Sequence, residues 1–204
     1  MSTVVLATHN KGKVAELRRI LAGLDVAGLD DFPGAPDVAE TEPAFEGNAL
    51  LKARAIAAFT GLPAVADDSG LCVDALNGMP GVLSARWSGR FGAGDRDTAN
   101  LELVLDQLAD VPDERRGGSF VCAAALVVPG GAEHVVEGRM RGTVIREPRG
   151  TGGFGYDPVF LPEGGTRTTA ELTPEEKDAI SHRGRAFRAL AEIVPGALRA
   201  AGLG

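Results

Sequence analysis

Positive charge is scarce in this chain. Its 21 basic side chains are outnumbered by 28 acidic ones among 204 residues, which gives a formal net charge of −7. Nonspecific binding to long nucleic acids or to anionic membranes needs a broad basic face. We therefore expect no nucleic acid and no membrane among its partners. A small polyanion can still bind where local cations and a divalent metal ion receive it.

Long apolar runs and cysteines are scarce as well. No run is long enough to span a bilayer, and the first residues, MSTVVLATHN, begin a strand rather than a secretory signal. The two cysteines, Cys72 and Cys122, are too few for a zinc site, and each lies in an apolar, strand-like run. We expect both to be reduced core residues, with a disulfide as the minor alternative, in a cytoplasmic protein.

Lysine is rare, with four lysines against seventeen arginines. All four lie in polar motifs: Lys11 and Lys13 in THNKGK, Lys52 in FEGNALLKA and Lys177 in EEKDAISHR. An ammonium group is a compact charge on a flexible stem, which suits it to phosphate oxygens. Together with the acidic pair in VADDSG, the lysines predict a site for a polyphosphate and a metal ion.

The order of apolar patterns predicts a single mixed α/β domain that covers residues 1–204. The firmest local signal is Thr173-Pro174-Glu175-Glu176, which combines an N-cap, a proline at the first helical position and a capping-box glutamate. The expected helices cover 13–21, 45–60 and 96–108, followed by a pair that begins near Thr173 and Ser181. The expected strands cover 4–7, 63–67, 71–76 and 119–128, followed by a strand pair in HVVEGRMRGTVI.

Two familiar nucleotide motifs do not apply. THNKGK lacks the earlier glycine of a P-loop, and Val14 follows the lysine where a P-loop has Ser or Thr. GTGGFG at 150–155 matches the dinucleotide pattern of glycines, but prolines flank it where a strand and a helix are required. The first loop still lies between a strand and a helix, an arrangement that presents backbone N–H groups to an anion.

The acidic pair Asp67-Asp68 is a candidate for metal binding and for activating water. Magnesium prefers oxygen ligands and often uses one or two carboxylates together with substrate phosphates, and a carboxylate can deprotonate an attacking water. Adjacent residues of a strand point to opposite faces. Only one of the pair can therefore enter a given cleft, the other being expected to cap a nearby N–H, and alternation alone does not say which.

Three further segments carry candidate groups. In FGYDP, Phe154 can stack on a base. Lys177 precedes Ser181 by four residues, and His182 and Arg183 follow in a first helical turn, where cations oppose the helix dipole. Asn48 and Lys52 also lie four apart, after Glu40 and Glu42, either of which could complete a metal shell. His9 is either a phosphate contact or an ordinary loop histidine.

Taken in order, these segments resemble the inosine triphosphate pyrophosphatases, also called the dITP/XTP pyrophosphatases. The matching stretches are VVLATHNKGKVAEL, FEGNALLKA, AVADDSGLCVDALNGMPGVLSARWSG, GTGGFGYDPVF and ELTPEEKDAISHRGRAF. The resemblance implies magnesium-dependent hydrolysis of non-standard purine nucleoside triphosphates (ITP, dITP, XTP) to monophosphate and pyrophosphate. It also implies an elongated α/β fold, with a mixed sheet flanked by helices and two lobes around a nucleotide-binding cleft, and a homodimer.

The resemblance also implies roles for individual residues. Asp68 would be the catalytic base and a metal ligand, with Glu40 as a second ligand to Mg²⁺. The triphosphate would be bound by the first loop, and Ser69 would contact substrate. The residues implied in substrate binding are Thr8, His9, Asn10, Lys11, Gly12, Lys13, Ser69, Phe154, Gly155, Tyr156, Asp157, Lys177, His182 and Arg183.

Some positions depart from the family pattern. His9 stands where a small residue is frequent, and Gly47 stands before Asn48 where a glutamate is common. Two alternative functions are also compatible with the sequence. One is a related phosphohydrolase for other modified nucleotides, and the other is a noncatalytic nucleotide sensor that uses its lysines only for binding.

Overall fold

The computed structural model describes residues 3–21, 24–92 and 94–203. Six strands form one mixed sheet in the order β2-β1-β3-β4-β5-β6. The strands are β1 (Val4–Leu6), β2 (Val26–Ala27), β3 (Ala64–Val73), β4 (Gly117–Val127), β5 (Glu133–Val144) and β6 (Phe160–Pro162). The α-helices are α1 (Lys11–Ile20), α2 (Phe45–Thr60), α3 (Arg96–Gln107), α4 (Pro174–Ile180) and α5 (His182–Ala200). The predicted α/β class with a mixed sheet and flanking helices is confirmed.

The sheet is mixed because its two ends pair differently. β1 pairs in parallel with both β2 and β3, with Val5 opposite Ala27 and Ala64, whereas β5 and β6 are antiparallel. Short 3₁₀ helices occupy much of the expected loop 77–90, including Gly81–Arg86. Within the described ranges, no helix combines the length and the apolar character needed to cross a membrane.

Local sequence signals correctly predicted the end of α2 and the start of α4. α2 spans the predicted residues and ends at Gly61, whose φ of 69° is the left-handed conformation that favours glycine. At the start of α4, the Thr173 side chain accepts from the Glu176 N–H, and the Glu176 side chain accepts from the Thr173 N–H. This capping box was predicted and is confirmed.

Two strand predictions were wrong. The segments 63–67 and 71–76 are not separate strands, because β3 runs unbroken from Ala64 to Val73 through the acidic pair. The segment expected to hold a strand pair is instead the single strand β5. DDSG has the composition of a turn, but hydrogen bonding to neighbouring strands overrides local preference. Gly70 is needed in β3, since a Cβ there would lie 2.4 Å from the carbonyl oxygen of Gly81.

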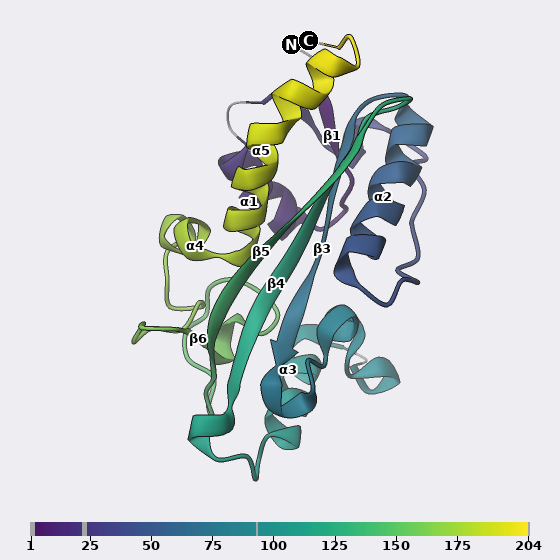
Figure 1. The fold of residues 1–204 in the computed structure, drawn as a ribbon. Helices are drawn as coiled ribbons and strands as arrows, with labels where there is room; N and C mark the ends of the chain where they lie inside the picture. Colours follow the sequence, from purple (N-terminus) through teal and green to yellow (C-terminus); the bar gives the residue numbers. More distant parts are fainter. Residues whose placement is uncertain (1–2, 22–23, 93, 204) are drawn as a thin grey trace. The chain divides into compact units, whose positions relative to one another are not determined.

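The chain divides into two compact units. Unit 1 comprises residues 1–68, 122–138 and 182–204. Its buried core joins β1, β3 and β4 to α1 and α5, with Leu17 and Phe187 among the fully buried side chains. Figure 1 shows α1 and α5 together on one side of the unit 1 strands and α2 on the other side. The strands of unit 1 therefore present one face to α1 and α5 and the opposite face to α2.

Unit 2 comprises residues 69–121 and 139–181. Its core packs α3 against β3, β4, β5 and β6, and includes Phe120 and Phe160, whose ring centroids are 4.5 Å apart. Arg116 is buried here at 2% exposure, and its guanidinium donates to the backbone carbonyl oxygens of Leu108, Val144 and Ile145. This side chain ties the end of α3 to the end of β5.

Candidate active site

The first loop of unit 1 has the predicted strand–loop–helix form. Asn10 is the N-cap of α1, and its Oδ1 accepts from the Lys13 N–H at 3.1 Å. The Asn10 N–H in turn donates to Thr8 Oγ1 at 3.2 Å, while the His9 side chain is exposed. The side chain of Lys11 lies outside what the structure describes. The loop therefore leads into the start of a helix, the element that favours anions.

Asp67 and Asp68 point to opposite faces of β3, as strand alternation requires. Asp67 Oδ2 lies 2.8 Å from Lys13 Nζ of α1 and 3.3 Å from Arg183 Nε of α5. Asp68 faces α2, where Asn48 Nδ2 donates to its Oδ2 at 3.0 Å. Because β3 is continuous, Asp67 faces α1 and α5 whereas Asp68 faces α2. The ion pairs of Asp67 were not predicted from the sequence.

These two carboxyl groups have opposite pKa shifts. Burial alone would raise the pKa of Asp67, but Lys13, Arg183 and Lys52 outweigh it and hold this pKa well below its ordinary value. Burial raises the pKa of Asp68, and the nearby Glu40 adds to the rise against the opposing effect of Lys52. Asp67 is therefore a fixed anion, whereas Asp68 binds a proton more readily than an ordinary aspartate.

Lys52 of α2 joins Asp68 to Glu40. Its Nζ lies 2.8 Å from Glu40 Oε1 and 3.4 Å from Asp68 Oδ1. Burial alone would lower the pKa of Lys52, but Asp68, Asp67 and Glu40 outweigh it and raise this pKa. Two carboxylates thus converge on one cationic nitrogen. The sequence placed Lys52 among the lysines of a polyphosphate site but gave it no individual role. Its spacing of four from Asn48 was the available signal.

Asp68 and Glu40 are the carboxylates that could hold a metal ion in unit 1. In residues 3–21, 24–92 and 94–203, no three His, Cys, Asp or Glu side chains cluster as a metal site. Asp68 and Glu40 can supply two oxygens, which suits magnesium, because this ion keeps several waters and takes further oxygens from phosphates. The Glu42 side chain instead packs against Gly47, where an added Cβ would meet Glu42 Cβ at 2.7 Å. Of the two glutamates, Glu40 is the one that shares the Lys52 ammonium with Asp68.

Unit 2 brings FGYDP together with the Lys177 helix. Asp157 Oδ2 accepts from Lys177 Nζ at 2.6 Å and from the Phe154 N–H at 2.8 Å. Asp157 Oδ1 accepts from Thr169 Oγ1 at 2.8 Å. The Lys177 ammonium also lies 5.1 Å from the centre of the Phe154 ring. The buried Asp157 carboxylate thus holds Lys177 and the Phe154 segment next to each other.

The neighbouring loop residues differ in their surroundings. The Gly155 N–H donates to Asp97 Oδ2 at 2.9 Å, which holds the loop against α3. The Tyr156 ring belongs to the core of unit 2, and its hydroxyl donates to the Ser84 carbonyl at 2.8 Å. Burial raises the pKa of Tyr156. The Tyr156 side chain therefore packs in the core of unit 2.

His182 and Arg183 occupy the first turn of α5, as predicted, and both are buried. The turn lies close to β5, since a Cβ added to Gly138 would fall 2.1 Å from the His182 carbonyl oxygen. Ser69 lies on β3 directly after Asp68 and is half-buried. The predicted site residues thus fall into two groups. Unit 1 holds the first loop, Glu40, Asp68, His182 and Arg183, whereas unit 2 holds Ser69, the FGYDP residues and Lys177.

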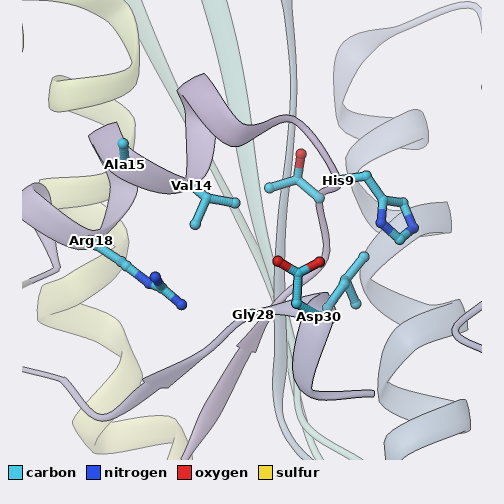
Figure 2. A pocket seen from close by; sticks show the side chains of 8 residues that line it. His9, Val14, Ala15, Arg18, Gly28 and Asp30 are labelled. Atoms are coloured by element: carbon cyan, nitrogen blue, oxygen red, sulfur yellow. The ribbon is translucent and has the colours of Figure 1, made fainter. Parts of the chain in front are cut away.

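A small hollow of about 260 Å³ borders the first loop in unit 1. Figure 2 shows it between α1, which contributes Arg18, and the segment that contains Gly28 and Asp30. Its lining residues are Thr8, His9, Val14, Ala15, Arg18, Gly28, Leu29 and Asp30. Pockets that bury drug-sized ligands are roughly 300–1,000 Å³. The volume of the hollow lies just below that range.

Known proteins resemble this chain over almost its full length. Residues 4–193 match the model of the Ham1 family. A protein of Streptomyces coelicolor named dITP/XTP pyrophosphatase is 62% identical over 198 residues, which cover 95% of this chain and 98% of that protein. A protein of Nocardia farcinica with the same name is 62% identical over 195 residues, which cover 93% of each chain.

Solved structures agree with this match. The crystal structure of a nucleoside-triphosphatase (dITP/XTP pyrophosphatase) from Mycobacterium abscessus is 60% identical, with a TM-score of 0.75, and the match covers 92% of this chain and 98% of that one. A HAM1 protein from Coxiella burnetii is 42% identical, with a TM-score of 0.85, and the match covers 97% of this chain and 100% of that one. The matches in sequence and in structure show that this chain belongs to the Ham1 family.

Proposed function

We propose that this protein hydrolyses non-standard purine nucleoside triphosphates, namely ITP, dITP and XTP, to the monophosphate and pyrophosphate. Such a reaction removes these nucleotides from the pool before they enter DNA or RNA. The observation that carries the proposal is the surroundings of Asp68, a buried carboxyl with a raised pKa that contacts Asn48 and Lys52. Membership of the Ham1 family, with relatives named dITP/XTP pyrophosphatases, supports the substrate class.

Asp68 would orient and deprotonate the water that attacks the α-phosphorus. Its raised pKa suits this role, because a base works best when its pKa approaches the working pH. Asn48 holds one carboxylate oxygen of Asp68, which leaves the other on the side of Lys52. The Lys52 ammonium would then lie near the reacting centre and stabilise the negative charge that develops there.

The first loop of unit 1 would bind the triphosphate. The residues proposed for this are Thr8, His9, Asn10, Lys11, Gly12 and Lys13. Asp68 and Glu40 would hold Mg²⁺, which when bound neutralises phosphate charge and so helps pyrophosphate to leave. We expect activity to be lost in EDTA and restored by magnesium. Activity that persists in EDTA would contradict the metal requirement.

Two sets of residues are proposed to contact the purine base of the substrate. In unit 2, Phe154 would stack on the purine and Lys177 would contact the nucleoside, and Asp157 would hold both in place. Ser69 and the backbone of Gly155 and Tyr156 would lie beside the substrate. In unit 1, His182 or Arg183 would donate to O6 of hypoxanthine or xanthine. Adenine presents a donor at that position, so it would leave a buried donor unpaired, at a cost of about 1–3 kcal/mol.

The test is product analysis after incubating the protein with magnesium and ITP, XTP, dITP, GTP or ATP. We expect monophosphate and pyrophosphate from the first three only. Diphosphate and phosphate would place the attack at the γ-phosphorus, and binding without turnover would favour a nucleotide sensor. Asp68→Asn should keep the fold and lower kcat at least 100-fold, while Asp110→Asn, at an exposed position, serves as the matched control.

We also propose that the chain forms one domain, since β3, β4 and β5 each contribute residues to both units. A single cooperative unfolding transition would support this. The family resemblance leads us to propose a homodimer, which light scattering after gel filtration would test. Cys72 and Cys122 are both thiols rather than half-cystines, which suits a reducing compartment, so we propose a cytoplasmic location, to be checked by fractionation.

A further inference from the structure

A single buried oxygen in unit 1 receives two cations from distant parts of the chain. Asp67 Oδ2 lies 2.8 Å from Lys13 Nζ, on α1, and 3.3 Å from Arg183 Nε, on α5. The Asp67 side chain is fully buried, and those of Lys13 and Arg183 are 15% and 6% exposed. The three charges are therefore screened little by solvent, so each strongly affects the others.

The reaction proposed above gives Asp67 no chemical step. A buried carboxylate destabilises the folded state because it loses its hydration, unless close cationic partners compensate for that loss. Asp68, its neighbour on the opposite face of β3, is the proposed base and contacts Asn48, whereas Asp67 faces the other way and is paired with Lys13 and Arg183. The charge on Asp67 therefore needs an explanation other than proton transfer.

We propose that Asp67 is a positioning residue that couples the phosphate end of the site to the base end through Lys13 and Arg183. This inference rests on the proposed function, in which Lys13 binds the triphosphate and Arg183 recognises O6. Both cations share one acceptor oxygen, so the pull of the Lys13 ammonium on Asp67 Oδ2 helps to set where this oxygen holds the Arg183 guanidinium. The position of the guanidinium, and with it base recognition, therefore depends on Lys13.

This coupling predicts a result that would not be expected if Lys13 and Arg183 acted independently. A change at Lys13, which belongs to the phosphate end, must alter the choice of base. Lys13→Met removes one of the two cations at Asp67 Oδ2, so the Arg183 guanidinium shifts and the preference for ITP over ATP changes. Residues that share a partner commonly show coupling of about 0.5–3 kcal/mol, which corresponds to roughly 2- to 150-fold in a rate ratio.

The experiment is a double-mutant cycle on kcat/KM for ITP and ATP, using Lys13→Met, Arg183→Gln and the double variant. We expect the ITP-to-ATP ratio in Lys13→Met to differ from wild type by about fivefold or more, and the two changes to be non-additive. In an Asp67→Asn background, Lys13→Met should leave the ratio unchanged. Arg199→Gln, at an exposed position of α5, replaces Arg183→Gln in the control cycle and should be additive.

Additive effects of Lys13→Met and Arg183→Gln, with an unchanged ratio in Lys13→Met, would overturn the coupling. This result needs no Asp67 variant, so it stands even where Asp67→Asn does not fold. Wild-type protein that hydrolyses ITP while the cycle is additive would refute the inference alone. Wild-type protein that does not hydrolyse ITP would refute the proposed function and the inference with it.

Discussion

Gly138 of β5 allows the first turn of α5 to approach the sheet, and Gly138→Ala tests that approach. A Cβ there would lie 2.1 Å from the His182 carbonyl oxygen and 2.5 Å from the Ala186 nitrogen, whereas ordinary contacts begin at 3.4 Å. Both obstacles are backbone atoms, which cannot rotate aside. β5 and α5 must therefore separate by roughly 1 Å, and overpacking of this kind costs about 1–3 kcal/mol.

The same displacement should reduce activity, because the moved turn carries His182 and Arg183. A misplacement of about 1 Å in a substrate-positioning group can cost roughly 100-fold in rate. We therefore expect Gly138→Ala to lose about 2 kcal/mol in the free energy of unfolding, measured in urea. We also expect kcat/KM for ITP to fall 10- to 100-fold, measured by pyrophosphate release.

Gly196→Ala is the matched control on α5 itself. Nothing lies within 4 Å of a Cβ at Gly196, so alanine there should be neutral or should stabilise the helix by about 0.5–1 kcal/mol, with turnover unchanged. Wild-type stability and turnover in Gly138→Ala would refute the reasoning. A loss of stability with kcat/KM intact would show that the displaced turn has no part in the site.

Three other substitutions test single contacts. Arg116→Met leaves three backbone carbonyl groups, two of them buried, without their donor, so the free energy of unfolding in urea should fall by about 3 kcal/mol with kcat unchanged; a fall below 1 kcal/mol would contradict this. Thr173→Ala removes the N-cap of α4 and should cost about 1 kcal/mol by thermal unfolding, whereas Thr173→Ser should not. Thr169→Val removes both hydrogen bonds from Thr169 Oγ1 to Asp157, so KM for ITP should rise severalfold and the free energy of unfolding should fall by about 1–3 kcal/mol; an unchanged KM would mean that Asp157 needs no such support.

Local structure followed from the sequence wherever a signal acts over a few residues. α2 ends where Gly61 adopts its left-handed conformation, and α4 begins at the capping box of Thr173. Both depend on hydrogen bonds between near neighbours along the chain. The turn-like composition of DDSG was misleading, because β3 is held by strands that are distant in sequence.

The sequence by itself determined which chemical groups the protein has and which family they indicate. It carries lysines only in polar motifs, an acidic pair on a strand and an aromatic loop, in the order of the Ham1 family. Only the tertiary structure decided the partners: Asp67 with Lys13 and Arg183, and Asp68 with Asn48 and Lys52. Alternation along a strand dictates that adjacent side chains diverge, but which helix covers each face depends on how the whole chain packs.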